Sequence, residues 1–218
     1  LLGRGFDRGA ARRAADACAA ELDGGESVGP EALPALRLYL DVLEATLAAM
    51  DDRGDEARRR LEAANARVDA VDRDPVRLDA RVEIAAVALL AGHPDLVDRG
   101  AIRRGGATLG RRSDARLAAV RGLLALVDGD VDSARAEAGR ARAASHPSDW
   151  EMGAFVRLLA AAAGPADAAT PRSDRAALAA LAEEAQEKGD RHTEAAARGT
   201  LERLDADPRA TVVTAGWS

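Results

Sequence analysis

Few residues of this chain could perform acid–base or metal chemistry, and they are scattered. Each of the three histidines (His93, His146 and His192) lies beside a proline or a Gly-Asp turn, and none has a second ligand at helical spacing. The segment Asp128–Asp132 (DGDVD) starts like a calcium loop, but it lacks the glycine at the sixth position and the closing glutamate. The sequence therefore predicts no catalytic residue, no cofactor and no metal site, and it indicates that the chain is not an enzyme.

Arginines dominate the charged residues between positions 99 and 121. On two adjacent helices several of them could face one way and bind phosphate, nucleic acid or an acidic peptide. The alternative is a solvated helix face with helical ion pairs, such as Asp95 with Arg99. No aromatic residues lie between these arginines to stack on bases. The cluster consists of Arg99, Arg103, Arg104, Arg111, Arg112, Arg116 and Arg121.

The composition favours an all-helical protein. Hydrophobic residues make up 47% of the 218 residues, but alanine supplies much of that share and aromatics only 2%. Strand-forming residues are too sparse for a sheet. Cys18 is the only cysteine, which excludes an internal disulfide, and it is expected to be a small apolar residue of the first helix.

The charged residues and the hydropathy of the chain predict its source genome and its localisation. The net charge is −6, and arginine outnumbers lysine thirty to one, since Lys188 is the only lysine. This bias indicates a GC-rich genome, such as that of a halophilic archaeon or an actinobacterium. No apolar run approaches the roughly 20 residues that span a bilayer. We therefore expect a cytoplasmic protein.

The clearest repeat-like segment is 115–147, which predicts two helices joined by a tight turn. Its first half places apolar residues three and four apart, on one helix face, and its second half places alanines in the same way. Gly129 suits the left-handed conformation that ends a helix, and Asp130 suits the cap of the next. Pro147 ends the second helix. The apolar positions are Leu117, Val120, Leu124, Val127, Val131, Ala134, Ala138, Ala141 and Ala144.

This segment resembles the tetratricopeptide repeat, a helix–turn–helix unit of about 34 residues. The family's small residues, turn glycine and closing proline match Gly122, Gly129, Ala134, Ala141 and Pro147. The family's bulky aromatics are absent, and Arg121 falls where the family prefers an apolar residue. The resemblance implies an α-solenoid of about four stacked antiparallel helix pairs. A compact helical bundle is the alternative.

The rest of the chain is interpreted as further pairs of one helical-repeat domain, 1–218. The predicted hairpins are about 4–50, 55–109, 111–147 and 149–205, followed by a tail, 209–218. In the first helix the predicted inward stripe is Phe6, Ala10, Ala14, Cys18 and Leu22. In the next helix it is Leu36, Leu40, Leu43, Leu47 and Met50.

Stacked pairs of this kind form a concave surface that binds peptides or proteins. The predicted function is therefore a non-enzymatic scaffold or adaptor for protein–protein interaction. The residues expected to point into its groove are Tyr39, Arg81, Arg116 and Leu123. The alternative is a regulatory module that binds nucleic acid or another polyanion through the arginines of 99–121. The sequence leaves the oligomeric state open.

Overall fold

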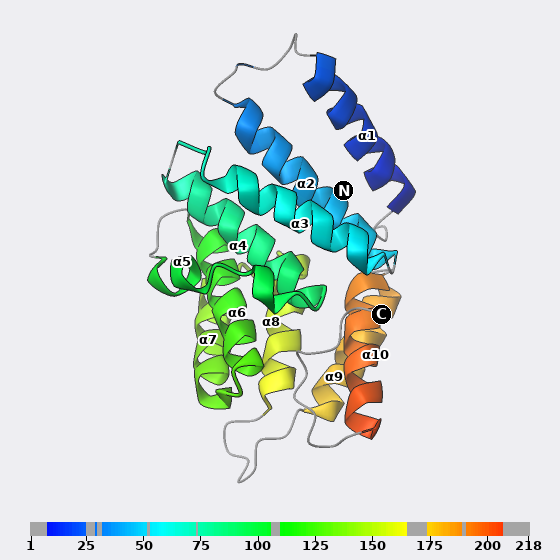
Figure 1. Cartoon of the computed structure of the whole chain (residues 1–218). Coiled ribbons are helices and arrows are strands. Elements are labelled where there is room, and N and C mark those ends of the chain that lie inside the picture. The colour runs from blue at the N-terminus through cyan, green and yellow to red at the C-terminus, as the bar shows by residue number, and fades with distance from the viewer. Residues whose placement is uncertain are drawn as a thin grey trace. The chain divides into compact units, whose positions relative to one another are not determined.

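The computed structural model describes residues 8–24, 29, 32–51, 53–72, 74–105, 110–164, 174–188 and 191–206. Every regular element in these residues is a helix (Figure 1), so the predicted all-α fold is confirmed. The predicted tail, 209–218, and Phe6 lie outside the described residues. The helices are α1 (Arg8–Gly24), α2 (Leu33–Met50), α3 (Gly54–Val68), α4 (Asp74–Leu90), η1 (Pro94–Leu96, a 3-10 turn), α5 (Arg99–Arg104), α6 (Arg111–Val127), α7 (Val131–Ala144), α8 (Trp150–Ala163), α9 (Arg175–Glu187) and α10 (Arg191–Ala206).

The described chain divides into two compact units. The N-terminal unit comprises the described residues up to Ala101, and the C-terminal unit those from Ile102 onward. Helix α5 spans the boundary. Among the described residues, no helix is long and apolar enough to cross a lipid bilayer.

The N-terminal unit is built around the pair α2 and α3. Helix α4 packs on both of them, and α1 packs along α2. Pro34 in the first turn of α2 suits that position, since its missing N–H would have no helical acceptor there. The core side chains include Leu38, Leu61 and Ile84, which are almost completely buried.

In α1 and α2 the predicted inward stripes are partly wrong. Three of the five residues predicted to face inward from α1 (Ala10, Ala14 and Cys18) are exposed, while Ala15 and Leu22 are buried. In α2 the buried stripe is Leu38, Asp41, Val42, Ala45 and Ala48, joined by Leu47 from the predicted one. Helix α2 carries apolar residues on two faces, so periodicity alone did not identify the face that meets α3 and α4.

The C-terminal unit pairs α6 with α7 and α9 with α10, and α8 packs against both pairs. One buried cluster joins α8, α9 and α10, with Trp150 packed at its edge. Helices α6 and α8 approach closely because Gly122 has no side chain: a Cβ atom there would lie 2.5 Å from Cδ2 of Leu159. The cluster consists of Ala154, Leu158, Ala161, Leu178, Leu181, Ala182, Ala197 and Leu204.

The helical hairpin predicted at 115–147 is present as α6 and α7. Gly129 has φ +76°, the left-handed conformation predicted for it. The Asp130 carboxylate accepts a hydrogen bond of 3.0 Å from the Ser133 backbone N–H, so it caps α7 as predicted. Hydrogen bonds from the side chain and the backbone of Ser133 lower the pKa of Asp130. Local turn chemistry therefore determines this connection.

Candidate functional site

The most distinctive polar group of the described chain is a buried carboxylate in the N-terminal unit. Asp41 lies in the middle of α2 and is only 6% exposed. Arg67 of α3 donates to its Oδ2, and Nη1 of Arg60 lies 3.6 Å from its Oδ1. Burial raises the pKa of Asp41, although Arg67, Arg60 and Arg37 oppose that shift. A polar residue inside the leucine-rich run of α2 was the signal for this site, and our sequence analysis missed it.

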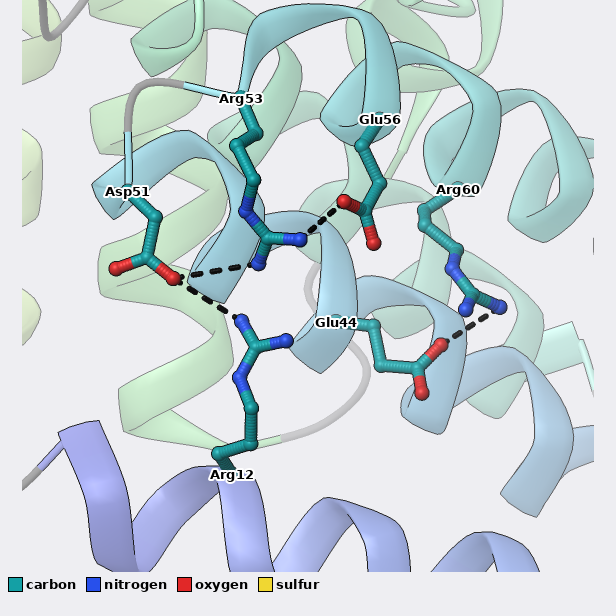
Figure 2. Close-up of polar contacts among 6 residues, drawn as sticks. All are labelled: Arg12, Glu44, Asp51, Arg53, Glu56 and Arg60. Carbon is teal, nitrogen blue, oxygen red and sulfur yellow. Dashed lines mark hydrogen bonds and ion pairs between the residues drawn. The ribbon is translucent and has the colours of Figure 1, made fainter.

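Arg60 also binds a second carboxylate of α2, that of Glu44. Nη1 of Arg60 lies 2.7 Å from Oε2 of Glu44 (Figure 2). Asp41 and Glu44 are three residues apart and so lie on the same side of α2. Arg60 therefore bridges two carboxylates and links α2 to α3.

A chain of ion pairs extends from α1 to α3 (Figure 2). Nη2 of Arg12 lies 3.1 Å from Oδ2 of Asp51, and Nη2 of Arg53 lies 3.2 Å from the same oxygen. Arg53 also binds Glu56 in the first turn of α3. The Arg12, Asp51 and Arg53 side chains are more than a third exposed, and exposed pairs of this kind contribute roughly 0–1 kcal/mol each. The chain of pairs consequently orients the helices more than it stabilises them.

Two of the predicted groove residues make contacts inside the N-terminal unit. The Tyr39 hydroxyl donates to Oδ2 of Asp79 over 2.9 Å, which joins α2 to α4. Arg81 of α4 lies 2.7 Å from Asp69 and 3.2 Å from Asp98. Arg81 therefore ties the end of α3 and the segment before α5 to α4.

The other two predicted groove residues belong to the C-terminal unit. Leu123 is only 5% exposed, and Arg116 is half-buried; both are in α6. The four residues are therefore divided between the units, and neither unit alone brings all four together. Their joint role in one groove stays a prediction.

The arginines of 99–121 are also divided between the units, since Arg99 belongs to the N-terminal one. Arg103 pairs with Asp128 over 3.2 Å, and Arg112 with Asp149 over 3.0 Å. Arg111, which is exposed, donates to the Ala143 carbonyl over 3.3 Å. Arg104 is likewise exposed. Polyanion binding stays a prediction, and the carboxylate partners count against it because they neutralise two of the cations.

Arg121 binds backbone. Its Nε donates to the Ile102 carbonyl over 2.9 Å, and its Nη2 donates to the Arg103 carbonyl over 3.1 Å and to that of Gly105. These carbonyls lie at the C-terminal end of α5, where no N–H group of the helix is available to donate a hydrogen bond to them. A cation also complements the negative end of the helix dipole. Arg121 is thus a C-terminal cap for α5.

Comparison with known protein families places the similarity in the N-terminal unit. Residues 6–90 match a family described as bacterial type III secretion protein (HrpB7). The match covers less than half of the chain, and it ends at Leu90, the last residue of α4. No curated protein and no solved structure gives a match.

This finding corrects the resemblance to the tetratricopeptide repeat, which is wrong: the family that matches is a different one, over other residues. The helical hairpin of 115–147 does form, but small residues, a turn glycine and an aspartate cap would be needed by any tight helical hairpin. They do not identify a family. The predicted origin in a halophilic archaeon or an actinobacterium has no support either.

Proposed function

We propose that this chain binds a protein of a bacterial type III secretion apparatus and that its N-terminal unit carries the contact. The observation that carries the proposal is the family match over 6–90, because those residues include all of α1, α2, α3 and α4. On this proposal the chain acts in the cytoplasm, by binding rather than by catalysis.

The proposed contact is the apolar stripe of α2 that begins at the exposed Leu36. Leu36 is 40% exposed and is the one exposed large hydrophobic side chain among the described residues. Tyr39, Leu40 and Leu43 are half-buried and follow it at steps of three, four and seven residues. This spacing is typical of the anchors through which one helix packs on another protein. We propose that an amphipathic helix of the partner packs there with its apolar face.

Binding by the full chain to purified apparatus proteins from the same genome tests this proposal. We expect one of them to bind, and Leu36→Asp to weaken its affinity about tenfold, since a carboxylate would lose its water in an apolar contact. Isothermal titration calorimetry measures the change.

The matched control is Ala180→Asp, which also places a carboxylate on an exposed helix position, in α9. It should leave the affinity unchanged. If no apparatus protein binds, or if both variants bind as the wild type does, the proposal is wrong.

A further inference from the structure

Helix α1 is attached to its unit by a small interface. Of residues 9–24, the part of α1 whose burial is described, only Ala15 and Leu22 are buried, and most of the others are exposed. Helix α2, by contrast, has six buried residues within its 18. A helix that buries so little apolar surface can separate from its neighbour without unfolding the rest.

Charges at both ends of the contact fix the direction of α1 along α2. Near the start of α1, Arg12 pairs with Asp51, which follows α2, over 3.1 Å (Figure 2). Near the end of α1, Nη2 of Arg37 of α2 lies 3.1 Å from Asp23 and donates to the Leu22 carbonyl over 3.3 Å. The surface of α2 is therefore complementary to an antiparallel helix that is positive near its beginning and negative near its end.

A second copy of this chain supplies such a helix with the required residues in the required order. Eight residues, 25–32, connect α1 to α2, and two of them are glycines. A segment of this length reaches at most about 28 Å when extended. An exchange of α1 between two copies requires that α2 of the adjacent copy begin within this reach.

We propose that α1 is an exchangeable helix, and that two copies form a dimer in which each α1 packs on the α2 of the partner copy. The exchange keeps the buried Ala15 and Leu22 and both ion pairs, because identical residues meet. The cost of opening the monomer is thus recovered in the dimer, and chain concentration determines how much dimer forms.

Two charge-reversed variants of the full chain test the exchange. In Arg12→Asp two carboxylates face each other when α1 folds back on its own α2, and in Asp51→Arg two guanidinium groups do. In an exchanged heterodimer of the two variants, both contacts have opposite charges again. Native mass spectrometry of the mixture, with one variant tagged, should show the heterodimer at about ten times the abundance of either homodimer in the same mixture.

The matched control is the double variant Arg12→Asp/Asp51→Arg, which restores opposite charges within one chain. When this double variant is mixed with a tagged copy of itself, the ratio of tagged–untagged dimer to the other dimers should equal that of the wild type. Equal amounts of heterodimer and homodimer in the two-variant mixture, or monomers alone, would overturn the exchange. If Asp51→Arg loses helical circular dichroism, the pair Asp23→Arg and Arg37→Glu applies the same test at the other end. None of these outcomes depends on an apparatus protein, so this proposal and the proposed function fail separately.

Discussion

The two units differ in the burial of the carboxylates that their arginines bind. In the N-terminal unit Arg60 and Arg67 meet a buried carboxylate, that of Asp41. In the described residues of the C-terminal unit the carboxylates that pair with arginine are half-buried or exposed. In the C-terminal unit three arginines bind carbonyls at the ends of neighbouring helices.

The three C-terminal caps follow one pattern. Arg121 binds the end of α5, and Arg111 binds the end of α7 through the Ala143 carbonyl. Arg135 binds the end of α8: its Nε lies 3.2 Å from the carbonyl oxygens of both Ala163 and Gly164. Carbonyls at a helix end lack intrahelical donors, so a guanidinium group satisfies them and complements the dipole. Arginine can therefore join helices through side-chain charge, as at Asp41, or through backbone carbonyls, as at the end of α5.

In the C-terminal unit α6 and α8 approach closely at Gly122. The largest effect we expect, a difference of about 2 kcal/mol between two glycine variants, tests that contact. Gly122→Ala in α6 should destabilise the chain by about 1 kcal/mol, because the new methyl group meets the fully buried Leu159 and overpacking exceeds the gain in helix propensity.

The control is Gly139→Ala in α7, where a new Cβ has nothing within 4 Å. It should stabilise by about 0.5–1 kcal/mol. Chemical denaturation would then separate the two variants by about 2 kcal/mol. Equal effects of the two changes would show that α6 and α8 are not in close contact.

The next effect concerns the capping arginines. Arg121→Gln should destabilise the chain by about 1.5 kcal/mol, since the carbonyls at the end of α5 lose charged hydrogen bonds. Arg104→Gln, at an exposed position of α5 itself, should change stability by less than about 0.5 kcal/mol. Thermal unfolding of both variants makes the measurement, and a similar loss in both would mean that Arg121 acts as a general surface charge.

The smallest effect concerns the charge network of the N-terminal unit. Burial raises the pKa of Asp41 above its ordinary value of 3.8, so the folded chain binds a proton at this carboxyl more tightly than the unfolded chain does. This group therefore stabilises the fold most at low pH, and its contribution is lost as pH rises from about 3.8 through the higher folded pKa. Asp41→Asn lacks this titration, so its stability relative to the wild type should increase as pH rises.

Denaturation midpoints measured between acid and neutral pH give this difference. Glu62→Gln, at an exposed position of α3 that pairs with Arg58, is the control and should not reproduce it. A difference between Asp41→Asn and the wild type that falls with rising pH would mean that the arginine pairs outweigh burial.

Several features of the molecule could be predicted from local sequence. The all-α fold follows from composition and periodicity, and the connection between α6 and α7 follows from Gly129 and Asp130, whose backbone and capping preferences act within a few residues. The sequence by itself therefore determined the helices and this turn.

Only the tertiary structure decided which helix faces are buried and which charges meet. Helix α2 is apolar on two faces, and the packing of α3 and α4 buried Leu38 and Asp41 while it left Leu36 exposed. The partners of Asp41 and of Arg121 lie 16 or more residues away in the chain, beyond the reach of helical spacing. The physical reason is that spacing along a helix specifies which residues share a face, whereas burial and ion pairing depend on the neighbours that the fold brings to that face.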